Sequence, residues 1–386
     1  MAAIEGTCDP RFEPVREAFA ENFEKRGEVG AAVAVTLEGR PVVDLWGGHA
    51  DKARTKPWTR DTIVNVYSAT KGFAATCVNR LADQGLIDLD APVARYWPEF
   101  AQAGKERLPV RFILSHRAGL PAVRKPLPDG ALLDWQVMTS ALAEQEPWWE
   151  PGTKHGYHAL TLGYLLGEII RRVTGKTIGA YCREQIAGPL ELDFHIGLDP
   201  RHDSRCAEVI AAPPPPPGQP NPLAPGDEDA DSMTMKAVNN PPGALRLSAI
   251  NSRAWRAAEV PAANGHTNAR AMARFYGALA RGGELDGVRV LSPAQVELGY
   301  QEQSNGPDAV MFGLPSRFGL GYRLTQPAAR YGPNPHTFGH TGAGGSLGFA
   351  DPNSKVGFGY AMNQMGSHML MDPRLVGLIG AIYASL

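Results

Sequence analysis

Strand-like segments lie at both ends of this chain, and helical segments fill the middle. Residues 31–36 and 41–46 are rich in β-branched and apolar residues and flank the turn at Glu38-Gly39, which is typical of a hairpin. Residues 319–364 form short strand-like runs divided by glycines. Residues 68 to about 200 show mostly helical spacing of apolar residues. The sheet must therefore be built from both termini, with a helical insertion between them, and we predict an α+β fold.

The individual elements follow from the same patterns. The helical spacing of apolar residues predicts flanking helices at 10–25, 268–281 and 373–384. The glycine-divided runs predict four strands, at 320–324, 337–341, 346–350 and 355–363. Five consecutive prolines and an acidic cluster lie within residues 211–243, a composition that predicts a long loop.

Composition excludes several classes of protein. A net charge of −2 without runs of lysine or arginine gives no case for nucleic acid. The four cysteines show no metal-type spacing, so we expect neither a metal nor a cofactor, and Cys77 reads as a buried free thiol. The N-terminus lacks the pattern of a signal peptide, and no apolar run is long enough to cross a membrane. We therefore expect a soluble, cytoplasmic enzyme, and its oligomeric state stays open.

The tetrapeptide Ser68-Ala69-Thr70-Lys71 follows the extended run 62–67 and begins a helical pattern. A hydroxyl and an amine one helical turn apart, at the positive end of a helix dipole, can make a serine nucleophilic without histidine. The alternative is a helix-capping serine beside a solvated lysine.

Two further motifs follow in order and give the chain a family resemblance. Tyr157-His158-Ala159 precedes a helical run, and His340-Thr341-Gly342 precedes the glycines Gly344 and Gly345. The order resembles the Ser-x-x-Lys, Tyr-x-Asn and Lys-Thr-Gly motifs of the serine β-lactamase and penicillin-binding-protein superfamily. The class C-like branch with the family VIII carboxylesterases is the most similar, and the resemblance runs from about residue 30 to 363.

The resemblance implies a fold and a set of roles. It implies one catalytic unit over 1–386: an antiparallel sheet flanked by terminal helices (about 1–67 and 245–386), a helical lobe (about 68–244), and an active site in the cleft between them. Ser68 would be the nucleophile, and Tyr157 the general base or part of it, with Lys71 holding its charge. The backbone N–H groups of Ser68 and Ala343 would form the oxyanion hole. The candidate substrate-binding residues are His340, Thr341, Gly342 and His158.

Two departures from the family pattern bear on the substrate. Ala159 replaces the asparagine of the second motif, and His340 replaces the lysine of the third. A neutral histidine removes a fixed cation that would bind a substrate carboxylate. We therefore expect a carboxylesterase that acts on small or medium neutral esters through an acyl-serine. The alternatives are a β-lactamase-like amidase or an acyltransferase using the same site, and an inactive binding protein of the same fold.

A few other residues are candidates on weaker patterns. Ser346 fits Gly-x-Ser-x-Gly, but the residues after it suggest a strand, so a sheet position is the better interpretation. For Ser115-His116 we expect only local hydrogen bonding. Two roles fit the aromatic residues of the middle and C-terminal regions equally well: apolar walls for an acyl chain, or ordinary packing. These residues are Trp148, Trp149, Phe312 and Phe318. We also place Asn264-Gly265-His266 at the border of the cleft.

Overall fold

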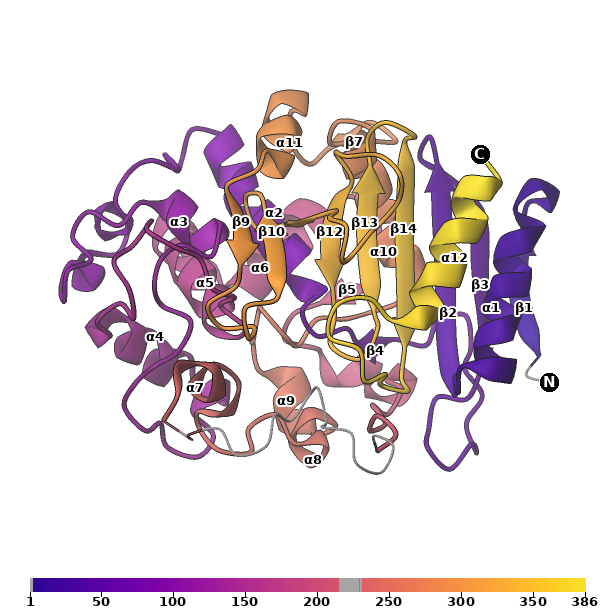
Figure 1. Cartoon of the computed structure of the whole chain (residues 1–386), viewed down its shortest axis with the longest axis horizontal. Helices are drawn as coiled ribbons and strands as arrows, with labels where there is room; N and C mark the ends of the chain where they lie inside the picture. Colours follow the sequence, from indigo (N-terminus) through magenta and orange to yellow (C-terminus); the bar gives the residue numbers. More distant parts are fainter. Residues whose placement is uncertain (1–2, 215–228, 230) are drawn as a thin grey trace.

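The computed structural model describes residues 3–214, 229 and 231–386. Its centre is a nine-stranded antiparallel sheet with the order β1-β3-β2-β14-β13-β12-β11-β10-β9 (Figure 1). The strands are β1 (Ile4–Cys8), β2 (Gly30–Leu37), β3 (Arg40–Gly48), β9 (Ser304–Pro307), β10 (Pro315–Phe318), β11 (Arg323–Leu324), β12 (Phe338–Thr341), β13 (Leu347–Asp351) and β14 (Val356–Met362). Pairing of β14 with β2 joins the two ends of the chain, which confirms the predicted α+β fold.

Helices cover both faces of this sheet. The terminal helices α1 (Glu13–Lys25) and α12 (Pro373–Ala384) lie side by side on one face, and α10 (Ala269–Ala280) covers the other (Figure 1). Side chains alternate along β14, so that Phe358 and Tyr360 join the core under the terminal helices. Gly359 faces α10, and a Cβ there would lie 2.1 Å from the carbonyl oxygen of Ala269. The absence of a side chain therefore allows the helix backbone to approach the strand directly.

The remaining helices form the second lobe and its connections. They are α2 (Thr70–Asp83), α3 (Val110–Leu114), α4 (Trp135–Glu144), α5 (Thr161–Thr174), α6 (Ile178–Cys182), α7 (Met233–Asn239), α8 (Leu247–Ile250), α9 (Arg253–Ala257) and α11 (Pro293–Tyr300). Two small sheets complete the fold, β4 (Val64–Asn65) with β6 (His266–Thr267) and β5 (Phe194–His195), and β7 (Glu284–Leu285) with β8 (Val288–Arg289). Phe73 of α2 stacks on Phe275 of α10, with ring centroids 3.9 Å apart. This contact fixes the helical lobe to the sheet lobe.

The predicted elements agree with these bounds, with one correction. The hairpin, the helices at 268–281 and 373–384 and the four C-terminal strands are confirmed. The loop predicted for 211–243 is wrong in part, because Ser232 caps a helix, α7, in which Ala237 is buried. Most of the proline run and of the acidic cluster falls outside the described residues. The lobe boundaries at 67/68 and 244/245 stay a prediction. In the described ranges, no helix combines the length and apolar character that crossing a bilayer requires.

Candidate active site

Ser68 lies on a sharp turn between β4 and α2. Tyr67, directly before it, has a φ of +47°, a left-handed conformation that a bulky residue adopts only when its surroundings enforce it. The backbone N–H of Lys71 donates to the carbonyl of Ser68 at 3.0 Å, so Ser68 sits in the turn that starts the helix. The hydroxyl is thus presented at the helix N-terminus, which the sequence pattern indicated.

The segment Asn264-Gly265-His266 supports this turn from behind. The N–H of Gly265 donates to Thr70 Oγ1 at 2.9 Å, and Thr70 Oγ1 donates to the carbonyl of Tyr67 at 2.5 Å. The Asn264 side chain is fully buried; it donates to the carbonyls of Trp255 and Ala258 and accepts from the N–H of Val260. These residues therefore contact the turn that carries the nucleophile, and their side chains do not line the cleft.

Lys71 is completely buried, with its amine beside the Ser68 hydroxyl. Nζ lies 3.0 Å from Ser68 Oγ, 2.7 Å from the carbonyl oxygen of Ala159 and 2.9 Å from that of Ala262. Burial, and then the charge of Arg323, lower the pKa of Lys71 well below its usual value. With three protons the amine donates to all three oxygens; after losing one it can still donate to the two carbonyls and accept a proton from Ser68.

Tyr157 packs against the same amine. Lys71 Nζ lies 4.8 Å from the centroid of the Tyr157 ring, and the backbone N–H of Tyr157 donates to Asp308 Oδ1 at 2.9 Å. Burial raises the pKa of Tyr157 to about 12, although the Arg323 charge and a hydrogen bond to Ser68 act in the opposite direction. The structure thus brings together Ser68, Lys71 and Tyr157 from separate parts of the chain.

The third motif ends strand β12 and turns back into β13 opposite Ser68. Gly342 packs directly on the nucleophile segment, since a Cβ on Gly342 would lie 2.2 Å from the carbonyl oxygen of Val66. Ala343, at the tip of the turn, is exposed and lines the same cleft as Ser68. Neither the backbone N–H of Ser68 nor that of Ala343 donates to another residue that the structure describes. Two free N–H donors therefore border the cleft next to the nucleophile.

The cleft itself is small, with a volume of about 130 Å³. Its lining comprises the nucleophile and Tyr157, the third-motif turn, and a mixed rim: Ser68, Tyr157, Met311, Arg323, Thr341, Gly342, Ala343, Gly345, Ser346, His368, Met369, Leu370, Asp372 and Leu375. The apolar part is Met311, Met369, Leu370 and Leu375. The sequence had suggested other apolar residues for this role.

Those suggested residues lie elsewhere. Phe318 is fully buried and stacks on Tyr157, with ring centroids 6.1 Å apart, and Phe312 is exposed. Trp148 donates to the carbonyl of Ala122, and Trp149 is buried. None of the four lines the cleft, so packing is the interpretation that the structure favours.

Arg323 is a cleft residue that the sequence patterns did not reveal. It lies on β11 opposite Gly339 of β12, and its guanidinium is 4.9 Å from the centroids of both Tyr157 and Phe318. It is buried, and it forms no hydrogen bond or ion pair with a described residue. The cleft therefore contains a fixed cation although His340 replaces the motif lysine. No spacing rule connects Arg323 to the motifs, because only the strand register places it there.

The two histidines of the motifs differ in what they can do. His158 is fully buried, with Nδ1 bonded to the carbonyl of Gly156 at 2.7 Å and Nε2 accepting from the N–H of Leu120 at 3.1 Å. Both ring nitrogens are therefore occupied within the protein, and His158 is absent from the cleft lining that was predicted for it. Burial lowers its pKa to about 4.

His340 is also buried, but only one ring nitrogen is engaged. Nδ1 bonds to the carbonyl of Thr341 at 2.7 Å, and Nε2 has no partner among the described residues. Its ring centroid lies 6.0 Å from that of Tyr157. Burial, Lys71 and Arg323 lower the pKa of His340 well below its usual value, so the ring is neutral.

The competing nucleophile candidates have structural roles. Ser346 is fully buried, directly precedes strand β13 and bonds to the carbonyl of Val66 at 3.5 Å, so no helix follows it. Ser115 Oγ donates to the carbonyl of Arg111 within its own short helix. Cys77 is a buried free thiol. Within the described parts of the chain, no group of three or more histidine, cysteine or acidic side chains is arranged to hold a metal ion.

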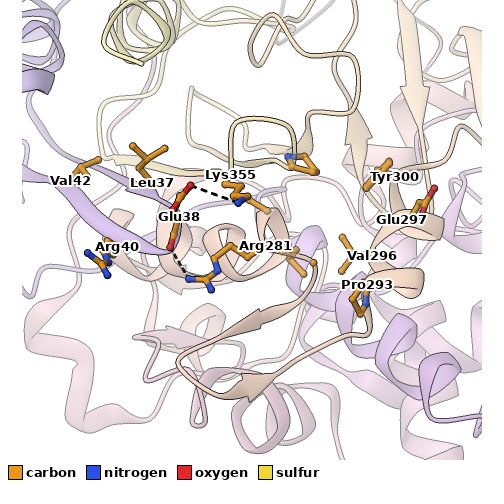
Figure 2. Close-up of a pocket in the computed structure, with 14 residues that line it drawn as sticks. Leu37, Glu38, Arg40, Val42, Arg281, Pro293, Val296, Glu297, Tyr300 and Lys355 are labelled. Atoms are coloured by element: carbon orange, nitrogen blue, oxygen red, sulfur yellow. Dashed lines mark hydrogen bonds and ion pairs between the residues drawn. The ribbon is translucent and has the colours of Figure 1, made fainter.

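A larger groove of about 910 Å³ lies at the far end of strand β13 from the third-motif turn. It is lined by the β2–β3 hairpin, the end of α10, α11 and the turn before β14. Lys355 pairs with the Glu38 side chain there, and Arg281 donates to the Glu38 carbonyl (Figure 2). No motif residue lines this groove, and its charged groups are mostly exposed. The chemistry points to the smaller cleft.

The motifs, their order and this geometry agree with a comparison against known proteins. The Beta-lactamase family profile matches residues 15–381. The chain belongs to the Beta-lactamase family. It is 41% identical to the esterase/beta-lactamase LipL of Mycobacterium tuberculosis over 97% of this chain and 86% of that protein. A crystal structure of a family VIII carboxylesterase superposes with a TM-score of 0.92 at 45% identity, and EstA from Arthrobacter nitroguajacolicus with 0.87 at 33%. The family VIII structure covers all of both chains; EstA covers 100% of this chain and 98% of its own.

Proposed function

We propose that this protein is a serine carboxylesterase that hydrolyses small esters through an acyl-Ser68 intermediate. The observation that carries the proposal is the contact of a buried amine with the serine hydroxyl, 3.0 Å apart, in a cleft bordered by two free backbone N–H groups. Hydrolysis through a covalent intermediate requires a nucleophile, a proton acceptor and donors for the oxyanion, and all three are supplied. No cofactor is needed for this reaction.

Lys71 is the better proton acceptor of the two candidates. The sequence patterns favoured a Tyr157 phenolate, but burial raises the pKa of Tyr157 to about 12 while that of Lys71 falls well below its usual value. The neutral amine takes the proton as Ser68 Oγ attacks the ester carbonyl carbon. The protonated amine then returns a proton to the departing alkoxide, with Tyr157 beside both groups as the relay. Water repeats the sequence on the acyl-enzyme and releases the acid.

The developing oxyanion would accept hydrogen bonds from the N–H groups of Ser68 and Ala343. Donors fixed in advance stabilise the transition state more than the ground state, and losing one typically costs about 10²–10³-fold in kcat. The left-handed Tyr67 and the contact of Gly342 with Val66 support this proposal, because they hold the two segments that carry these N–H groups against each other.

Two serine variants test the proposal. Ser68→Ala should abolish hydrolysis of short-chain p-nitrophenyl esters, with kcat falling by roughly 10³-fold or more, while the thermal unfolding midpoint stays close to that of the wild type. Ser346→Ala is the matched control and should keep most of the activity. Loss of activity in Ser346→Ala together with retention in Ser68→Ala would refute the assignment.

Arg323 favours a second candidate that shares this site, hydrolysis of a β-lactam or another substrate that bears a carboxylate. A buried guanidinium whose Nε has no partner among the described residues can bind a carboxylate strongly, and the cleft supplies it where the motif lysine is missing. For Arg323→Met we expect kcat/KM on nitrocefin to fall further, by at least about 10-fold, than kcat/KM on p-nitrophenyl acetate. Equal losses on both substrates would count against this second activity.

A further inference from the structure

A buried cluster of charged side chains lies directly behind the third-motif turn and has no part in the chemistry above. It consists of Glu28 before β2, Tyr360 on β14, and Asp372 and Arg374 at the start of α12. Arg374 is 3% exposed, Glu28 4% and Tyr360 0%. Buried charges are costly unless they are paired and hydrogen-bonded, so such a cluster needs a reason.

The guanidinium of Arg374 connects every part of this cluster to the turn. It forms two bonds to Asp372, at 2.9 and 2.8 Å, and two contacts of 3.2 Å with Glu28, which also accepts from the Tyr360 hydroxyl. The remaining N–H donors go to backbone carbonyls, that of Gln364 at 2.8 Å and that of Gly344 at 2.7 Å. The planar guanidinium of Arg374 therefore binds two carboxylates and two backbone carbonyls at once.

The third-motif turn packs directly on the guanidinium of Arg374, with no side chain between them. Gly344 and Gly345 have φ values of +84° and +125°, which favour glycine. A Cβ on Gly345 would lie 2.9 Å from Arg374 Nη2 and 3.1 Å from Asp372 Oδ2. The carbonyl of Gly344 also accepts from the N–H of Gly366 at 2.8 Å, so it is held from two directions. Ala343 directly precedes this fixed carbonyl.

We propose that Arg374 is a positioning residue for the oxyanion hole, whose guanidinium holds the carbonyl of Gly344 and thereby keeps the N–H of Ala343 aimed into the cleft. The proposal rests on the proposed function, because it assumes that this N–H stabilises the oxyanion. An oxyanion donor must be placed before the reaction, and a displacement of about 1 Å can cost about 10²-fold. Two glycines make the turn intrinsically flexible, so the rigidity must come from a neighbour.

Arg374→Lys is the decisive variant. It keeps the single positive charge beside Glu28 and Asp372, but a single ammonium cannot reach both carboxylates and both carbonyls. We expect kcat on p-nitrophenyl acetate to fall by about 10- to 100-fold with KM changed by less than about 2-fold, because the lost interaction forms in the transition state. Titration with a fluorophosphonate should still count one reactive site per chain.

The matched control is Arg171→Lys. Arg171 also binds a buried carboxylate through two bonds, to Glu168 at 2.8 and 2.7 Å, but on α5 and not at the cleft lining. Both variants should lower the thermal midpoint, and only Arg374→Lys should lower kcat per titrated site. A fall in titrated sites with unchanged kcat per site would mean a structural role only and would overturn the proposal.

Hydrogen exchange measures the rigidity of the third-motif turn independently of catalysis. The amides of Gly342 and Gly345, which donate within the turn, should exchange at least about 10-fold faster in Arg374→Lys than in the wild type, while α5 is unchanged. Unchanged exchange there would overturn the positioning role, and faster exchange with unchanged kcat would overturn the link to the oxyanion hole.

If Arg374→Lys does not fold, the double variant Arg374→Met with Glu28→Gln preserves the net charge of the cluster and is measured in the same way. A wild type without esterase activity would refute the proposed function, and the exchange data would still decide whether Arg374 fixes the turn.

Discussion

At the scale of single residues, the proposed mechanism depends on a lysine whose pKa is lowered by burial. Among the residues that the structure describes, the hydrogen-bond partners of Lys71 are one hydroxyl and two carbonyls, with no carboxylate. Because its pKa is lowered, the amine stays a base at pH values where an ordinary lysine is protonated. Activity should therefore fall as the pH drops through the pKa of Lys71, where the amine takes up a proton and can no longer accept one from Ser68.

Arg323 allows this interpretation to be tested by pH. Its charge lowers the pKa of Lys71, so Arg323→Met should raise that pKa and move the acidic limb of the kcat/KM profile to higher pH. The measurement is the pH dependence of kcat/KM on a neutral p-nitrophenyl ester. Arg317→Met, on the neighbouring strand and paired with Glu302, is the control and should leave the limb in place. A limb that stays or moves to lower pH in Arg323→Met would contradict a lysine base.

Short motifs in the sequence indicate candidate site residues, but they give no signal for the residues that pack around them. Ser68, Lys71 and Tyr157 are found from spacing, because each belongs to a short motif. Arg323 and Arg374 belong to none, and each reaches the site through the pairing of strands or the docking of a helix that is distant in sequence. His158 shows the opposite error, since a residue within a motif was assigned to the substrate while its ring nitrogens bond to protein.

At the scale of elements, the fold depends on close contact between α10 and the sheet. Gly359 on β14 leaves no room for a side chain against the backbone of Ala269. Gly359→Ala should therefore force the helix away and destabilise the protein by about 1–3 kcal/mol, measured as the free energy of unfolding in urea. Gly380 in α12 has open space around its Cα, so Gly380→Ala should stabilise the protein by about 0.5–1 kcal/mol. Destabilisation of similar size in both variants would contradict this account.

Elements with strong patterns were predicted and weak ones were missed. The hairpin and α12 have clear apolar periodicity, and their bounds agree with the structure. Strand β9, with the sequence Ser-Asn-Gly-Pro, carries no strand signal, and β1 lies at the sheet edge with three exposed residues in its middle. Such strands form because a neighbouring strand offers free hydrogen-bonding groups, which local sequence does not encode.

At the scale of the whole molecule, several buried histidines make stability depend on pH. Burial lowers the pKa of His158 to about 4 and that of His266 to about 3, from an ordinary value of 6.5. Below about pH 6.5 the unfolded chain therefore binds protons on these histidines that the folded protein does not bind. Stability is lost as the pH falls from about 6.5 towards these values. Each pKa unit is worth about 1.4 kcal/mol, so the loss should reach several kcal/mol.

Urea unfolding at pH 7.5 and pH 4.5 measures this loss. In His266→Gln the free energy of unfolding should differ less between the two pH values than in the wild type, because glutamine binds no proton in the unfolded chain. An equal difference in both proteins would mean that His266 does not contribute.

The order of strand-like and helical segments was enough to predict a sheet built from both ends of the chain around a helical insertion. The antiparallel sheet with its flanking helices was expected from the family resemblance. The family match over residues 15–381 and the TM-score of 0.92 confirm the predicted family and fold. The carboxylesterase expectation agrees with the relatives, whereas the preference for neutral esters weakens, since Arg323 restores a cation to the cleft.

The central claim is that Ser68 is the activated nucleophile, and the position of a covalent adduct tests it most directly. After reaction of the wild-type protein with a fluorophosphonate, intact mass and peptide mapping should show one adduct per chain, on Ser68. The adduct should be absent from Ser68→Ala and form more slowly in Lys71→Met. An adduct on Ser346 or Ser115, or an unmodified Ser68 in protein that has lost its esterase activity to the reagent, would contradict the account.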